Sequence, residues 1–336
     1  MEGVNFLFRT LCTVTILFSI SAYATEKKLI VDHDGGADDA MAIFLALLNE
    51  KYFDGPEVVA ITTTHGNVDE NQVFYNTQRI LNVAQRPDVP IYRGSPSALI
   101  RDFPSDLYFG YDGLGDNTTT VEPIAAQKEN AAEALIAFSK KLKGGLTIVT
   151  LGPLTNIALA MKLDADFMSR LSQIFIAASY IYTDNIPQKV EFNVKMDIEA
   201  YYIVVENGLL DKVTLIPSTT VKSYLNLGKV WRLDILGKIQ SNVIKAMNVY
   251  ERISLSRSND WHPLDAAAMS IVLNAMIVGE VKYTWNYLNL CGNRRGMTEN
   301  NFNFKTPNAK IIYTLKKEAY RVFLLKIFSA DVESEN

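Results

Sequence analysis

The chain has few cysteines and little net charge, and it lacks a hydrophobic run long enough to span a membrane comfortably. Only two cysteines occur among its 336 residues, and Cys12 lies in an N-terminal segment that we expect to be removed. The remainder, with Cys291 alone, cannot form an internal disulfide, so we expect that thiol to be buried or to pair between two chains. The net charge of −4 gives no electrostatic basis for binding nucleic acid. Repeats and low-complexity tracts are lacking too, and 48% hydrophobic residues is typical of a globular protein.

The hydrophobic run from Leu11 to Ile20 has the features of a secretory signal. It follows Arg9 and precedes Ala22-Tyr23-Ala24, a small-x-small cleavage site. The run is short for a membrane span, although an uncleaved anchor is the alternative interpretation. We therefore predict a signal peptide over residues 1–24, one domain over residues 25–336, secretion to the extracellular space with no membrane partner after cleavage, and a glycosylation sequon at Asn117.

Four carboxylates follow a short apolar segment near the start of the predicted domain. Leu29 to Val31 is typical of a buried parallel strand, and a helical pattern starts near Asp38. Two carboxylates about 4 Å apart repel by roughly 1 kcal/mol in water and about 4 kcal/mol at an intermediate dielectric. A bound cation would offset this repulsion, and oxygen ligands favour Ca²⁺ or Mg²⁺. The alternative is that the acids only cap the helix. The four acids are Asp32, Asp34, Asp38 and Asp39, separated by Gly35 and Gly36.

Apolar strands alternate with helical segments through most of the chain. This order predicts an α/β fold with a mainly parallel, Rossmann-like open sheet, helices on both faces, and additional C-terminal helices and strands. Ligands of such sheets bind beyond the carboxyl ends of the strands. Those ends carry Asp34, Asn67, Leu151 and the segment before Asn193. Glu191 and Asn193 would share one face if that segment is extended.

Several motifs, in order, resemble those of the nucleoside hydrolases. The first is Asp-x-Asp-x-Gly-x-Asp-Asp-Ala between a strand and a helix, with Gly35 where the family usually has Pro. An isolated Asp-x-Asp-Gly also suggests a haloacid-dehalogenase-type phosphatase, so the other motifs decide. They are Thr64-His65-Gly66-Asn67, Leu151-Gly152-Pro153-Leu154-Thr155-Asn156, Asn185 with Glu191-Phe192-Asn193, Asp197 and Ala200, and Asp265-Ala266-Ala267-Ala268.

The resemblance implies a role for each matching residue. It implies Ca²⁺ as the cofactor, a water on that ion as the nucleophile, and Asp34 as the base that deprotonates the water. The implied Ca²⁺ ligands are the carboxylates of Asp34, Asp39 and Asp265 and the carbonyl of Leu151. The implied ribose contacts are Asp38, Asn67 and Asn193 at the 2′- and 3′-hydroxyls, and Asn185 and Glu191 at the 5′-hydroxyl.

Simpler explanations exist for several of these residues. Asn67 and Asn156 can serve as turn or cap residues, and we favour that role for Asn156. Asp265 can be an ordinary helix N-cap, with Asp260 as the competing ligand. Glu191 and Asn193 can lie on a surface strand.

The departures from the family pattern concern the leaving base. Many relatives have His directly before the last motif Asp, where this chain has Leu264. His262 is the candidate substitute as leaving-group acid, and surface or packing roles are the alternative. Trp261, with Tyr108 and Phe109, supplies aromatic rings for stacking a base. By strand alternation we expect His33 to point away from the motif carboxylates.

We therefore predict a secreted, Ca²⁺-dependent hydrolase that cleaves ribonucleosides to ribose and free base. Purine nucleosides such as inosine are expected first, and uridine next. The resemblance also implies a homodimer or homotetramer. The alternatives are a secreted nucleoside-binding protein without turnover and, from the isolated motif, a dehalogenase-type phosphatase. The sequence leaves open the base preference, the leaving-group acid, the oligomeric state, the tissue, the state of Cys291 and glycan occupancy at Asn117.

Overall fold

The computed structural model describes residues 27–182 and 189–333, which include neither the predicted signal peptide nor Asn185. In these residues the strands form one nine-stranded sheet in the order β3-β2-β1-β4-β5-β6-β9-β7-β8. All neighbours pair in parallel from β3 to β9, and only β7 runs antiparallel to its neighbours. The strands are β1 (Lys28–His33), β2 (Glu57–Thr63), β3 (Ile91–Tyr92), β4 (Leu146–Thr150), β5 (Gln173–Ala177), β6 (Val213–Ile216), β7 (Val278–Leu288), β8 (Thr298–Asn301) and β9 (Ala309–Leu315).

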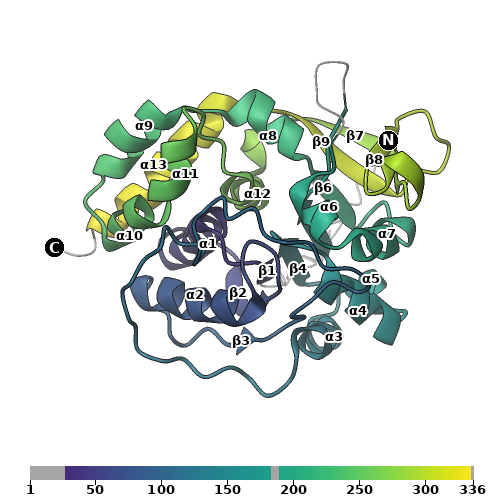
Figure 1. The fold of residues 1–336 in the computed structure, drawn as a ribbon, viewed down its shortest axis with the longest axis horizontal. Helices are drawn as coiled ribbons and strands as arrows, with labels where there is room; N and C mark the ends of the chain where they lie inside the picture. Colours follow the sequence, from purple (N-terminus) through teal and green to yellow (C-terminus); the bar gives the residue numbers. More distant parts are fainter. Residues whose placement is uncertain (1–26, 183–188, 334–336) are drawn as a thin grey trace, which may run out of the picture.

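Helices lie on both sides of this sheet (Figure 1). They are α1 (Ala37–Phe53), α2 (Glu70–Val83), α3 (Ala131–Lys141), α4 (Thr155–Leu163), α5 (Phe167–Arg170), α6 (Phe192–Met196), α7 (Ile198–Glu206), α8 (Ser218–Leu225), α9 (Lys229–Asp234), α10 (Asn242–Tyr250), α11 (Arg252–Arg257), α12 (Leu264–Leu273) and α13 (Lys317–Glu333). Figure 1 shows α9, α10, α11 and α13 gathered at one end of the molecule, opposite β7 and β8. The predicted α/β fold with added C-terminal elements is confirmed.

The residues of β1 explain why the strand lies in the middle of the sheet. Leu29, Ile30 and Val31 are all fully buried, as expected of a strand covered on both faces. Leu29 and Val31 belong to the hydrophobic cluster that includes α1, α12 and α13. Ile30 belongs to the second cluster, with α3, α4 and α7. The alternation of side chains along β1 thus divides the core into one layer on each face.

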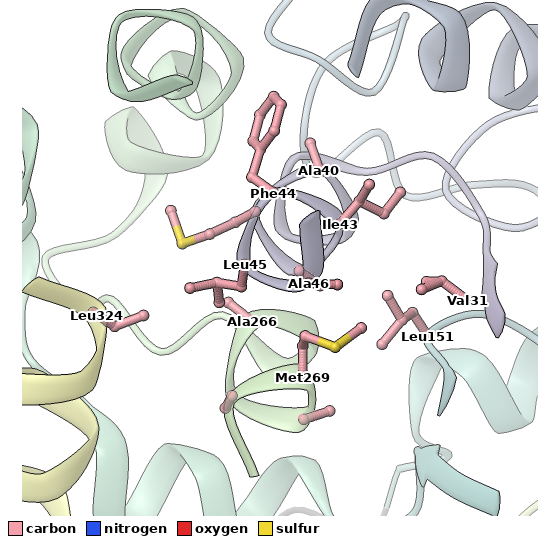
Figure 2. Close-up of a cluster of buried hydrophobic side chains, with 14 of the residues drawn as sticks. Val31, Ala40, Ile43, Phe44, Leu45, Ala46, Leu151, Ala266, Met269 and Leu324 are labelled. Atoms are coloured by element: carbon pink, nitrogen blue, oxygen red, sulfur yellow. The ribbon is translucent and has the colours of Figure 1, made fainter. Parts of the chain in front are cut away.

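Helix α1 is buried on nearly all sides, because its Ala37 to Leu48 segment is apolar all round apart from its acids. It packs against α12. Figure 2 shows Ala46 of α1 near Ala266 and Met269 of α12, with Leu324 of α13 on one side and Leu151 on the other. Small side chains at this contact let the two helices lie close together. The first turns of the two helices also lie close together, since Asp38 and Asp39 of α1 approach Asp265 of α12.

Candidate active site

The site lies where the strand order of the sheet reverses. Strands β2 and β3 follow β1 on one side, while β4 to β6 lie on the other, so β1 and β4 are the adjacent strands of the switch point. In open α/β sheets, ligands bind beyond the carboxyl ends of these strands. Asp34 follows β1 and Leu151 follows β4, and the Leu151 amide donates to the Asp32 carbonyl at 2.8 Å. The two predicted segments are thus brought together.

Three carboxylates converge from the first turns of α1 and α12. One carboxylate oxygen from each of Asp38, Asp39 and Asp265 lies within 4.8 Å of the others. Asp39 and Asp265 are buried, and Asp38 is half-buried. Burial and mutual repulsion raise the pKa of Asp39 and of Asp265 well above the ordinary range, and burial raises the pKa of Asp38 to about 6. All three acids can be ionised together at neutral pH only if a positive charge lies beside them.

Asp34 lies beside this cluster and is held by the loop after β2. The Asn67 amide donates to Asp34 Oδ2 at 2.9 Å and Asn67 Nδ2 donates to Asp34 Oδ1 at 2.7 Å. Burial raises the pKa of Asp34 to about 7, and its charge in turn raises the pKa of Asp39. The cluster of three close carboxylates thus contains Asp38 in place of Asp34. The family resemblance had named Asp34, with Asp39 and Asp265, as the cation ligands. A Cβ on Gly66 would lie 2.0 Å from Asp34 Oδ2, so only glycine fits there.

The donor set fits a hard divalent cation. It consists of carboxylate oxygens. Leu151 lines the same cavity as Asp38 and Asp265, and its carbonyl accepts a 2.7 Å hydrogen bond from Asn193. Neither cysteine nor histidine belongs to the described acid cluster. Oxygen-only sites of this kind suit Ca²⁺ or Mg²⁺. The expected alternative ligand, Asp260, instead accepts a 2.7 Å hydrogen bond from Asn226.

A cavity of about 240 Å³ opens beside the acids and combines polar and aromatic walls. Its size and mixed lining suit a small polar ligand that has one flat apolar part. Of the predicted site residues it is lined by Asp38, Asn67, Leu151, Glu191, Asn193, Trp261, His262 and Asp265, while further walls come from Asp106, Tyr108, Phe109, Phe192, Glu251, Ser254, Leu255, Asp260, Pro263 and Leu264.

The Glu191 segment is not extended, which was the condition under which Glu191 and Asn193 would share one face. It forms the short helix α6, with Glu191 as the N-cap that accepts from the Val194 amide at 3.1 Å. The Ser218 hydroxyl donates to Glu191 Oε1 at 3.1 Å, and burial raises the pKa of Glu191. Asn193 Nδ2 donates to the carbonyls of Leu151 and Ala177 at 2.7 and 2.8 Å. Both side chains reach the cavity from a helical turn, and the surface-strand alternative is wrong.

The histidines lie in different surroundings. His262 lines the cavity, where burial, and next the Lys222 charge, lower its pKa. The expectation for His33 is wrong, because its Nδ1 lies 3.8 Å from Asp39 Oδ1 while its Nε2 bonds to Thr77 at 2.9 Å. Side chains at odd positions of β1 point toward α1, which carries Asp39.

Two residues outside the cavity also differ from what the sequence predicted. Cys291 is exposed rather than buried. Asn156 is buried and holds two strands rather than capping a turn, since its Nδ2 donates to Asp32 Oδ1 at 2.7 Å and to the Thr63 carbonyl at 2.9 Å.

Sequence reasoning missed Glu251, a buried carboxylate in the wall of the cavity. It accepts hydrogen bonds from Arg232 Nε and Trp261 Nε1, both at 2.6 Å. No motif surrounds it, and a Glu in a helical segment is usually a solvated residue. The only available signal was a tryptophan following shortly after it, which needs a partner for its N–H when buried.

Comparisons with known proteins agree with this geometry. The sequence model of the inosine-uridine preferring nucleoside hydrolases matches residues 29–322. A probable uridine nucleosidase 2 of Oryza sativa subsp. japonica is 37% identical over 191 residues, which cover 55% of this chain and 55% of that protein. A pyrimidine-specific ribonucleoside hydrolase of Salmonella schwarzengrund is 30% identical over 218 residues, covering 64% of this chain and 68% of the relative. The chain spans about half the length of the uridine nucleosidases it matches.

Solved structures match over most of the chain. A plant nucleoside hydrolase superposes with a TM-score of 0.80 at 26% identity, covering 91% of this chain and 99% of the other. An inosine-guanosine nucleoside hydrolase superposes with a TM-score of 0.82 at 26% identity, covering 90% and 98% of the two chains. The similarity to these structures therefore extends over about nine-tenths of this chain.

Proposed function

The chain belongs to the family of inosine-uridine preferring nucleoside hydrolases, and from this membership we propose that it hydrolyses the N-glycosidic bond of ribonucleosides to ribose and free base. The observation that carries the proposal is the juxtaposition of the buried acids with a cavity whose wall includes both polar and aromatic side chains. Breaking this bond builds positive charge on the ribose ring, and fixed carboxylates stabilise such charge.

We propose Ca²⁺ as the cofactor. Asp34, Asp39, Asp265 and the Leu151 carbonyl would hold it, with Asp38 close to the same oxygens. When bound, Ca²⁺ offsets the charge of these acids and lowers the pKa of the water that it binds. The relatives' names do not state a metal, so the support is the oxygen-only donor set.

We assign the proton transfer from water and the binding of ribose to side chains of this chain. Asp34 accepts a proton from the attacking water, and its two hydrogen bonds from Asn67 fix the orientation of its carboxylate. Asp38, Asn67 and Asn193 bind the 2′- and 3′-hydroxyls of ribose. The described hydrogen bonds of Asn193 use only its amide nitrogen, which leaves the amide oxygen to accept from a hydroxyl. Glu191 binds the 5′-hydroxyl, and Asn185, outside the described residues, is its expected partner.

The leaving base is the part of the substrate for which this chain departs from the family. With Leu264 in the usual place of the acid, we propose that His262 donates the proton to the base. Burial, and next the Lys222 charge, lower the pKa of His262, so its protonated form is less populated at neutral pH than that of a free histidine. We propose purine nucleosides such as inosine first, on the support of the Tyr108, Phe109 and Trp261 rings, and uridine next. The similar uridine nucleosidases favour the second substrate.

We further propose that the protein is secreted after loss of residues 1–24 and that it forms a homodimer or homotetramer. Within residues 27–182 and 189–333, no helix is long and apolar enough to cross a membrane. The support for secretion remains the hydrophobic run with its cleavage motif.

The deciding experiment is ribose release from inosine, uridine and adenosine, with Ca²⁺ or with a chelator. We expect release that depends on the metal, with inosine fastest. Binding of nucleosides without release would favour the binding-protein alternative. Release from phosphate esters with Mg²⁺, and none from nucleosides, would contradict the assignment and favour a phosphatase.

A further inference from the structure

A buried arginine lies behind the aromatic wall of the cavity. Arg232 on α9 is fully buried. Its Nε donates to Glu251 Oε2 at 2.6 Å, and its Nη1 donates to Asn248 Oδ1 at 2.8 Å. Burying such an ion pair costs desolvation free energy, and a well-packed apolar pair is often as stable. We therefore expect the Arg232–Glu251 ion pair to fix the conformation of the side chains around it rather than to add stability.

The second oxygen of Glu251 fixes the indole of Trp261. Trp261 Nε1 donates to Glu251 Oε1 at 2.6 Å, and the side chain is 4% exposed. The main chain of Trp261 is tied as well, because its amide donates to Asn226 Oδ1 and its carbonyl accepts from the Leu227 amide, both at 3.0 Å. Trp231 lies against the same ring, with centroids 5.8 Å apart. The plane of the indole is thus set by contacts in several directions.

Both Glu251 and Trp261 line the cavity, and Trp261 shortly precedes Asp265 in the chain. We propose that Glu251, held by Arg232, is a positioning residue that sets the Trp261 indole as the surface on which the nucleobase stacks, so that larger planar bases bind better. This inference rests on the proposed function, since it concerns the base end of the same cavity. Stacking on an aromatic side chain favours the binding of any base, because every base has a planar π-face.

The test compares Glu251→Gln with Trp261→Phe in the full chain. A glutamine has one acceptor oxygen for two donors, so either the indole N–H or the guanidinium loses its partner. We expect the KM for inosine to rise about tenfold, from the loss of one buried hydrogen bond, with kcat changed by less than about threefold. The KM for uridine should rise less, because a smaller base stacks over less area. Inhibition by D-ribose, which lacks a base, should stay unchanged.

Intrinsic fluorescence gives a readout that does not need turnover. Titration with hypoxanthine should quench the wild-type protein, and Trp261→Phe should lose that part of the signal. Glu251→Gln should keep the quenching but need a higher hypoxanthine concentration. If the wild-type protein quenches with hypoxanthine yet releases no ribose, the proposed hydrolase activity fails while the positioning inference stands.

Glu70→Gln is the matched control. Glu70 is also a buried glutamate that pairs with an arginine, Arg93, and accepts from the Thr63 hydroxyl at 2.6 Å, but it does not line the cavity. This variant should lower the unfolding midpoint without changing the ratio of the inosine and uridine KM values. The inference is wrong, and Glu251 is only structural, if Glu251→Gln behaves like this control. The same holds if Glu251→Gln weakens the binding of D-ribose and of hypoxanthine equally.

Discussion

The acid cluster should destabilise the protein when the cation is removed. With carboxylate oxygens of Asp38, Asp39 and Asp265 within 4.8 Å of one another, each ionised pair repels by about 3.5 kcal/mol or more at an effective dielectric of about 20. Three such pairs amount to about 10 kcal/mol, comparable with the whole stability of a typical domain. The metal-free chain must therefore take up protons at this cluster, or unfold more easily.

The sign of the pH dependence follows from the raised pKa values. A carboxyl whose pKa is higher in the folded state stabilises the fold below its ordinary pKa and loses that contribution as the pH rises through the folded value. With Asp38 at about 6 and Asp34 at about 7, the metal-free chain should lose stability as the pH rises from about 4 to about 7. Ca²⁺ should reverse this loss, and its effect on Tm should be larger at the upper end of the range.

The substitution Asp265→Asn tests the repulsion among these carboxylates directly. It keeps the side-chain shape and removes two of the three repulsive pairs. Because proton uptake already relieves part of the repulsion, we expect the metal-free variant to gain about 2–4 kcal/mol at neutral pH, or about 3–6 °C in Tm for a domain of this length. The Tm increase with Ca²⁺ should be lost. Calorimetry of both proteins with a chelator, and with Ca²⁺, measures these shifts.

Asp197→Asn is the control for this measurement. Asp197 is buried too, but it accepts from the Thr155 hydroxyl at 2.7 Å and from the amides of Leu99 and Ala200. Its replacement should lower Tm with and without Ca²⁺. The electrostatic reasoning is refuted if Asp265→Asn lowers the metal-free Tm as the control does, or if the wild-type Tm is flat across this pH range.

Three further experiments test the roles of single residues. Asp34→Asn should reduce ribose release by at least about 10²-fold, with an unchanged circular dichroism spectrum, because a carboxamide cannot accept the proton; a variant that keeps most activity would contradict the assigned base. His262→Ala should slow inosine hydrolysis much more than hydrolysis of p-nitrophenyl riboside, whose leaving group needs no proton, and Leu264→His should restore part of the loss; equal slowing of both substrates would remove His262 from this role. Gly36→Ala should raise the KM for inosine, since a Cβ there would lie 2.9 Å from the Phe109 ring and displace it from the cavity wall; an unchanged KM would show that Phe109 does not contact the base.

The sequence predicted the part of the site that depends on strand ends. An apolar strand followed by acids and glycines places Asp34 at the carboxyl edge of the sheet, and the Leu151 motif does the same after β4. Both predictions follow from local rules. The local error at Glu191 has an equally local cause, because glutamate is not among the preferred N-cap residues and a five-residue helix shows no clear periodicity. The His33 error came from ignoring which helix covers the odd side chains of β1.

The other half of the site depends on helices that stand off the sheet, and no strand rule applies to them. Arg232 and Glu251 come from different helical segments, 19 residues apart, and meet Trp261 only through tertiary packing. The residues proposed to bind ribose lie in motifs that resemble those of the family, whereas the residues proposed to bind the base depend on pairwise contacts among α9, the turn before α11 and the segment before α12. Base preference should therefore change through substitutions in these helices that leave the acid cluster and ribose binding intact, which is the separation that Glu251→Gln is designed to reveal.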